Sequence, residues 1–108
     1  MDIRTNIAGD SCELLVSGRV DGDGANQLDE QLLGLLFKKL PNGQDARRVY
    51  VDLRGATFLC SAGLRALMQH SRTMKNRHGE LLVTRPSPEA AEVLKMVGLY
   101  DQLVEKET

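Results

Sequence analysis

A serine at the predicted start of a helix is the side chain best placed for chemistry in this sequence. The segment Val51–Leu64 reads VDLRGATFLCSAGL, and Ser61 stands where an apolar run and a loop give way to a helical pattern. A helix N-terminus offers unpaired N–H groups and the positive end of the helix dipole, so a phosphoryl group on the Ser61 oxygen would be bound there. The small residues Ala62 and Gly63 would leave the hydroxyl accessible to a partner. The alternative is that Ser61 only caps the helix, which is the common role of serine at such a position.

The other reactive side chains form no catalytic or metal-binding pattern. Cys12 and Cys60 are far apart. We interpret Cys60 as a small apolar filler, although a thiol near a helix start could also act as a redox sensor. We predict that His70 and His78 are surface residues of one helix, because no acid in the sequence is placed to orient either ring. Zinc-ligand spacing, a phosphate-binding glycine loop and a G-x-S-x-G motif are all missing. We therefore expect no metal, no cofactor and no enzymatic activity, and a hydrolase with a nucleophilic Ser61 is the weakest alternative.

The composition describes one domain of ordinary globular type. The 108 residues are 42% hydrophobic, 27% charged and 4% aromatic, with a formal net charge of -1. The lack of a basic excess and of aromatic residues argues against nucleic acid as a partner. No apolar run approaches the roughly 20 residues that span a bilayer. Residues 1–10 do not resemble a secretory signal, and two separated cysteines fit a reducing compartment. We expect one cytoplasmic domain over residues 1–108, without membrane insertion.

Alternating strands and helices are predicted to position the serine. Alternating or apolar runs predict two strands within residues 1–20, joined by a turn at Gly9-Asp10, and further strands at 48–53, 80–84 and 99–104. Apolar residues at helical spacing predict helices at 25–40, 61–79 and 87–98. Asp23 is expected to cap the first helix. This order predicts an α/β fold with a mixed, mostly parallel sheet, an N-terminal antiparallel hairpin and about three to four packed helices.

Nearly the whole chain resembles STAS domains, the family of sulfate-transporter and anti-sigma-factor-antagonist domains. The family pattern is an apolar strand ending in Asp-Leu, then an aromatic residue, an aliphatic residue, Asp or Ser, Ser, a small residue and Gly-Leu. The matching positions are Val51-Asp52-Leu53, Phe58, Leu59, Cys60, Ser61, Ala62, Gly63 and Leu64. Residues 15–21 resemble the family's strand-to-loop element, with Asp21 as its loop Asp. Residues 94–99 resemble its last helix and Gly-Leu exit.

The resemblance implies a function for Ser61. In anti-sigma-factor antagonists of this family, the serine that begins S-x-G-L is phosphorylated by a Ser kinase that is also an anti-sigma factor. The unphosphorylated form binds this partner and frees the sigma factor, and phosphorylation breaks the complex. The resemblance therefore implies an anti-sigma factor/Ser kinase as partner and a Ser phosphatase that restores the binding form. The alternative is a STAS subunit of a transport complex, which docks on an ATPase component and is never phosphorylated.

The partner surface is expected to surround the serine. It comprises Asp21, Cys60, Ala62, Gly63, Leu64 and Arg65. Asp21 also fits a simpler role as turn former or helix cap, and Arg65 fits that of a solvated surface cation. Two positions depart from the usual family pattern: Cys60 replaces the common Asp, and Ala62 replaces the common Ser or Thr. The missing Asp removes a negative charge beside Ser61, which would either ease phosphorylation or remove a contact that the kinase needs.

Overall fold

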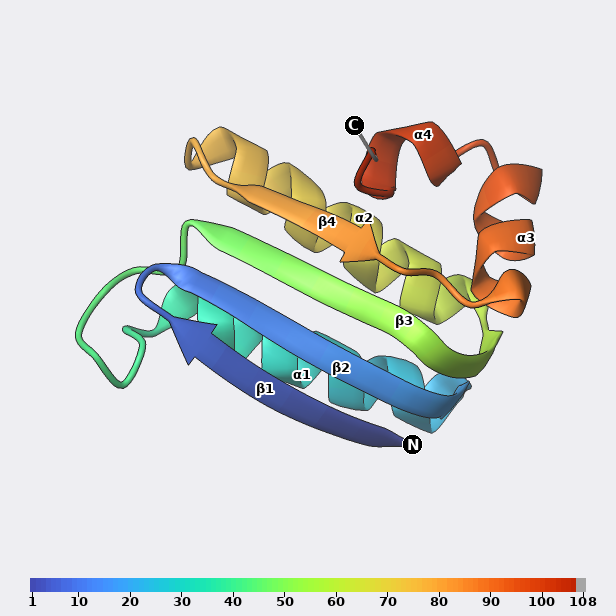
Figure 1. The fold of residues 1–108 in the computed structure, drawn as a ribbon, viewed down its shortest axis with the longest axis horizontal. Coiled ribbons are helices and arrows are strands. Elements are labelled where there is room, and N and C mark those ends of the chain that lie inside the picture. Colours follow the sequence, from blue (N-terminus) through green and yellow to red (C-terminus); the bar gives the residue numbers. More distant parts are fainter. Residues whose placement is uncertain (107–108) are drawn as a thin grey trace.

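Two long helices pack against one face of a four-stranded sheet (Figure 1). The computed structural model describes residues 1–106 of the expected 1–108 domain, so residues 107–108 lie outside the described part. The elements are β1 (Asp2–Ala8), β2 (Ser11–Val20), α1 (Gly22–Phe37), β3 (Arg48–Leu59), α2 (Ser61–Asn76), β4 (Glu80–Thr84), α3 (Pro88–Met96) and α4 (Tyr100–Leu103). The sheet order is β1-β2-β3-β4, with β1 antiparallel to β2 and the other pairs parallel. The α/β fold predicted from the sequence, with its mixed sheet and N-terminal hairpin, is confirmed.

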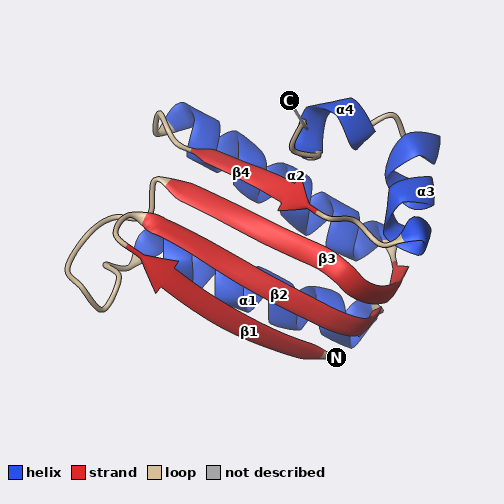
Figure 2. Cartoon of the chain, in the orientation of Figure 1, coloured by secondary structure: helices blue, strands red, loops and turns tan. Residues whose placement is uncertain are grey.

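The core lies mainly between the sheet and the helices α1 and α2, and buried residues of α3 and α4 extend it. Within residues 1–106, no helix covers the opposite face of the sheet (Figure 2). Side chains alternate between the two faces of a strand. In β2, Cys12, Leu14 and Val16 are buried, and the residues between them are only half-buried. Parallel pairing sets Cys12 beside Val49 and Leu14 beside Val51, so these buried residues share one face. The helical residues that pack on this layer include Leu28, Leu32 and Leu36 of α1 and Leu64, Leu67 and Met74 of α2.

Helix α1 begins at Gly22 rather than at Ala25, where its apolar spacing starts. The reason is its N-cap, which is Asp21 and not the predicted Asp23. The Asp21 backbone is extended, and its Oδ1 accepts a hydrogen bond from the Gly24 N–H at 3.0 Å. An N-cap satisfies one of the N–H groups that the first turn leaves unpaired. The connection between β2 and α1 is therefore shorter than the predicted element ends imply, and Gly22 and Gly24 belong to the helix.

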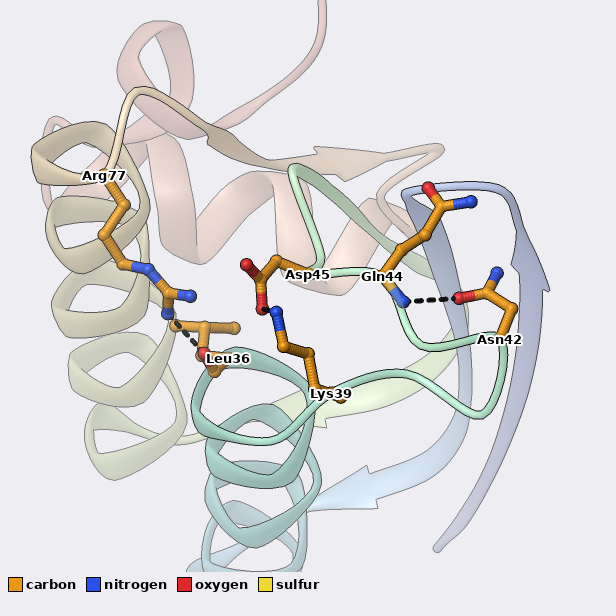
Figure 3. A network of polar contacts seen from close by, with 6 residues as sticks. All are labelled: Leu36, Lys39, Asn42, Gln44, Asp45 and Arg77. Carbon is orange, nitrogen blue, oxygen red and sulfur yellow. Dashed lines mark hydrogen bonds and ion pairs between the residues drawn. The ribbon is translucent and has the colours of Figure 1, made fainter.

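Helix α1 also ends earlier than predicted, at Phe37. Leu33 and Phe37, on the outer side of the helix, are 41% and 64% exposed. Leu40 is buried although it follows the helix. The Leu36 carbonyl oxygen accepts a hydrogen bond from the Arg77 guanidinium at the end of α2 (Figure 3). This contact satisfies one of the carbonyl groups that a helix end leaves unpaired.

Polar contacts also hold the loop between α1 and β3 (Figure 3). Lys39 Nζ lies 2.9 Å from Asp45 Oδ1, and the hydrogen bond and charge of Lys39 lower the pKa of Asp45. The Asn42 side chain accepts a hydrogen bond from the Gln44 N–H at 3.0 Å. Its amide also donates to the Gly9 carbonyl oxygen at 2.8 Å. The loop is thereby attached to the turn between β1 and β2, at the end of the sheet opposite the start of α2.

Strand β3 is longer than the predicted strand at 48–53. It pairs with β2 as far as the Val20 and Leu59 positions, with two register shifts on the way. The loop predicted after Leu53 is therefore mostly strand. As a consequence, β3 leads the chain directly into Cys60 and Ser61 at the start of α2.

The predicted strand at 99–104 is wrong. The segment forms the short helix α4, and only Val104 makes an isolated bridge, with Val83 of β4. Leu103 and Val104 are buried against the sheet edge. The neighbouring helix α3 ends at Met96, short of the predicted residue 98, and Val97 is 52% exposed. Among residues 1–106, no helix is long and apolar enough to cross a bilayer.

Candidate functional site at the start of helix α2

Ser61 is exposed and is the first residue of α2. The N-cap is Cys60, so the alternative interpretation, in which Ser61 only caps the helix, does not hold. The Cys60 side chain makes no hydrogen bond to the helix, and the first turn contains no acidic residue. Such a turn retains N–H groups without a capping side chain and the positive end of the dipole. The hydroxyl therefore projects from a helix start that is suited to an anionic group.

The loop of Asp21 lies beside that of Ser61. The Cys60 N–H donates to the Val20 carbonyl oxygen at 2.9 Å, which ties the end of β2 to the start of α2. Since β2 and β3 are parallel neighbours, α1 and α2 both begin at the same end of the sheet (Figure 1). The Asp21 carboxylate is exposed but engaged in the cap of Gly24. The two loops are therefore adjacent in the fold.

A groove runs between the first halves of α1 and α2. Its volume is about 240 Å³, and its lining residues are Ala25, Asn26, Asp29, Ala62, Arg65, Ala66 and Gln69. Arg65 is exposed and also borders a second hollow of about 390 Å³ along the outer face of α2. Ala62 is half-buried. The surface next to Ser61 therefore combines a small apolar residue with a cation one helical turn away.

Two of the predicted partner residues are buried. Gly63 and Leu64 face the sheet, and Leu64 is only 7% exposed. A Cβ atom at Gly63 would lie 2.9 Å from Leu59 Cδ1 and 3.0 Å from Val20 Cγ1. Glycine at this position lets α2 approach the ends of β2 and β3 closely. Gly63 and Leu64 thus determine where Ser61 lies, whereas the accessible side chains of the group are those of Ser61 and its exposed neighbours.

His70 is buried, and its predicted surface position is wrong. It is 2% exposed, and its Nε2 lies 2.7 Å from Asp29 Oδ1 on α1. Its Nδ1 is also buried, without a hydrogen-bond partner in the described part of the chain. The spacing of Leu67, Ser71 and Met74 places residue 70 in the same inward stripe, so periodicity could have identified it. The acid that orients the ring lies on another helix, and no local pattern reveals it.

The two cysteines differ in environment. Cys12 is 1% exposed, and burial, together with the charge of Asp10, raises the pKa of its thiol. A thiol that stays protonated is a poor nucleophile. Cys60 is half-buried beside Ser61, which fits a filler with partial access. His78 is exposed, as predicted, at the end of α2.

Arg19 and Phe58 form a pair that the sequence analysis missed. The guanidinium carbon of Arg19 lies 4.4 Å from the centroid of the Phe58 ring, a cation–π geometry. Pairing of β2 with β3 places the two residues side by side, just before Val20 and Leu59. Phe58 is 39% exposed. The pair therefore offers an exposed aromatic and a cation close to the loop of Ser61, and only the parallel register reveals it.

Within residues 1–106, no three His, Cys, Asp or Glu side chains form a group that could hold a metal ion. The accessible chemistry of the site is thus that of a hydroxyl, a half-buried thiol and a few charges.

Residues 3–105 match the family described as Mlab, STAS domain. The chain belongs to this family, and the resemblance seen in its sequence is confirmed. No curated protein is significantly similar to the chain.

Solved structures share this fold at low sequence identity. The anti-sigma factor antagonist SpoIIAA in its unphosphorylated form has a TM-score of 0.80 and 15% identity, over 98% of this chain and 89% of that chain. Bacillus SpoIIAA in the phosphorylated form has a TM-score of 0.72 and 14% identity, over 98% and 92%. A sulfate transporter family protein from Wolinella succinogenes has a TM-score of 0.69 and 15% identity, over 91% and 75%. At these identities, the likeness establishes the fold.

Proposed function

We propose that the chain is an anti-sigma-factor antagonist of a bacterial partner-switching pathway and acts in the cytoplasm. Its unphosphorylated form binds an anti-sigma factor that is also a Ser kinase. Phosphorylation of Ser61 releases it, and a Ser phosphatase restores the binding form. The observation that carries this proposal is the exposed Ser61 hydroxyl at a helix start without a capping side chain. The fold likeness to SpoIIAA, which has been solved both with and without phosphorylation, supports it.

The local electrostatics explain how one phosphoryl group would act as a switch. It adds a charge of about -1.5 to -2 to a position that is otherwise neutral. Arg65 follows Ser61 at i+4 on the helix surface, a spacing at which opposite charges attract. A phosphate on Ser61 would therefore attract the Arg65 guanidinium, which otherwise lines the groove between α1 and α2. Phosphorylation would change both the charge at Ser61 and the position of the Arg65 guanidinium.

The partner surface in this proposal is centred on Ser61, Ala62 and Arg65. Asp21 lies on the neighbouring helix start and contributes an exposed carboxylate. Cys60 is half-buried at the edge of the surface, and Gly63 and Leu64 act from beneath by fixing the position of α2.

Capture and reconstitution test the proposal. Ser61→Ala, which cannot be phosphorylated at that position, serves as bait in extracts of the native cell, and the captured kinase is then purified. We expect this kinase with ATP to place one phosphate on Ser61 of the parent chain, detected by intact mass and peptide mapping, and none on Ser61→Ala. A phosphate on Thr57 or Ser11, or no phosphate from an active kinase, would contradict the assignment.

A second candidate function is a STAS subunit of a transport complex. The fold likeness to the Wolinella sulfate transporter family protein favours it. In that case the surface around Ser61 would dock on an ATPase component, and the parent chain isolated from cells would carry no phosphate. The bait would then capture transporter subunits in place of a Ser kinase.

A further inference from the structure

Strand β1 forms an exposed and unprotected edge of the sheet. It is the first strand in the order β1-β2-β3-β4, and no described element lies beyond it (Figure 2). Six of its seven residues are exposed, and Ile3 is half-buried. Natural edge strands are commonly protected by Pro, Lys or a bulge. The strand DIRTNIA has no Pro or Lys, pairs with β2 without a register shift, and carries only the charges of Asp2 and Arg4, which lie 3.5 Å apart.

The hairpin geometry determines which backbone groups of β1 are free. A two-residue turn at Gly9-Asp10 joins Ala8 to Ser11, and Gly9 has the positive φ of +61° that such turns require. A two-residue hairpin closes on a hydrogen-bonded pair, and bonded and non-bonded pairs then alternate along the strand. The residues whose N–H and C=O groups point away from β2 are therefore Ile3, Thr5 and Ile7.

The side chains of these three residues also share one face. They lie opposite the buried Val16, Leu14 and Cys12 of β2, and so on the side of the helices. Helix α1 covers them incompletely, because Ile7 remains 37% exposed and Thr5 is exposed. The edge thus offers a row of free hydrogen-bonding groups beside a partly open apolar strip.

We propose that β1 pairs antiparallel with β1 of a second copy of the chain, across a two-fold axis at Thr5. In this register every residue of Asp2–Ala8 has a partner. Ile3 of each copy meets Ile7 of the other, and Thr5 meets Thr5, which are favourable cross-strand pairs. A two-fold axis at Arg4 would oppose two like charges, which is unfavourable. Axes at Ile3 or Asn6 would pair fewer residues of the strand.

Such pairing joins the two sheets into one continuous sheet with the helices of both copies on the same face. Ser61 follows β3, and β2 separates it from β1 in the sheet. The Ser61 surface of each copy therefore stays accessible, so dimer formation and partner binding are independent. Failure of the dimer would leave the proposed function intact.

Sedimentation equilibrium over a wide concentration range tests the proposal. The parent chain should pass from monomer to dimer as its concentration rises. Thr5→Pro removes only an outward N–H, and Thr5→Lys sets two cations against each other at the axis. Both variants should weaken the dimer by about tenfold or more and retain the parent's circular dichroism. Should Thr5→Pro fail to fold, the dimer affinity of Thr5→Lys alone tests the proposal. A parent chain that stays monomeric, or a dimer that withstands Thr5→Lys, would overturn the proposal.

Disulfide formation checks the register. In a Cys60→Ser background, Thr5→Cys places two thiols opposite each other at the axis, so mild oxidation should give a covalent dimer. Asn6→Cys is the matched control, because in this register residue 6 lies opposite Arg4 of the second copy. Equal cross-linking of the two variants would contradict pairing centred on Thr5.

Discussion

His70 Nε2 on α2 lies 2.7 Å from Asp29 Oδ1 on α1, and this contact joins the two helices whose first turns form the candidate partner surface. His70 is 2% exposed, whereas the Asp29 side chain is 41% exposed. Asp29 also lines the groove that Ala62 and Arg65 border. A buried ring held by a groove residue therefore fixes the spacing of α1 and α2 where a partner would bind.

Asp29→Ala should lower the free energy of unfolding by about 1–3 kcal/mol, because it leaves the buried His70 nitrogen without a partner. Asp29→Asn keeps an acceptor oxygen and should recover most of this loss. Urea denaturation monitored by circular dichroism measures both effects. Glu30→Ala, at an exposed neighbouring position, is the control and should stay within about 0.5 kcal/mol of the parent. A loss in Asp29→Ala no larger than that of the control would show that the contact contributes nothing.

The order of elements could be predicted because hydrophobic period and turn residues are local signals. The exact ends of the helices and strands, however, depend on tertiary contacts. Both Asp21 and Asp23 are suitable caps by residue type, and the extended backbone at Asp21, held at the end of β2, decides between them. The residues after Leu53, RGATFL, look like a loop in the sequence, yet pairing with β2 makes them strand as far as Leu59.

The candidate site likewise has features that the sequence predicts and features that only the packed structure shows. Ser61 at a helix start follows from the local pattern and from the family motif. The Asp29–His70 bond and the Arg19–Phe58 pair each join residues from separate elements, so only the packed structure shows them. The burial of Gly63 and Leu64 depends on how closely α2 approaches the sheet, which the motif alone does not state.

Asp21→Ala should cost about 1 kcal/mol of stability, because it removes the side-chain cap of α1. Asp23→Ala is the matched control and should cost about 0.3 kcal/mol, the contribution of an exposed acid in the first turn. Asp21→Asn keeps a capping oxygen and removes the charge, so its partner affinity reports the electrostatic role of Asp21 separately from its structural one. Thermal and urea unfolding of the three variants give the comparison. A larger loss in Asp23→Ala than in Asp21→Ala would reverse the cap assignment.

The two thiols should differ in reactivity towards a thiol reagent. Cys60 is half-buried and should react in the native protein, whereas Cys12 is buried and should react only after unfolding. Cys60→Ser should therefore remove the fast phase of the reaction with the reagent. It should still bind the partner if Cys60 is a filler. Partner binding measured with and without mild peroxide distinguishes a filler from a redox sensor. Peroxide-sensitive binding in the parent but not in Cys60→Ser would make Cys60 a redox switch.

Alkaline pH should destabilise the protein in part through Cys12. Burial, and then Asp10, raise the pKa of this thiol above its ordinary value of 9.0. Because the folded-state pKa is above the unfolded one, the stabilisation is fully present below pH 9.0 and is lost as pH rises towards the folded-state pKa. The free energy of unfolding of Cys12→Ala, although lower at neutral pH, should fall less steeply above this value than that of the parent. Parallel slopes for the two proteins would exclude this contribution.

Ser61→Asp should bind the captured partner at least about tenfold more weakly than the parent, a loss of about 1.4 kcal/mol, because it places a charge on the neutral centre of the proposed surface. Ser61→Ala should bind like the parent, since a methyl group keeps that position uncharged. Gln102→Glu adds the same charge at an exposed position on α4 and controls for net charge. Calorimetric titration of the four proteins against the partner measures the affinities. Equal affinities of Ser61→Ala and Ser61→Asp would place the contact surface elsewhere, and a matching loss in Gln102→Glu would mean that the partner responds to net charge rather than to Ser61.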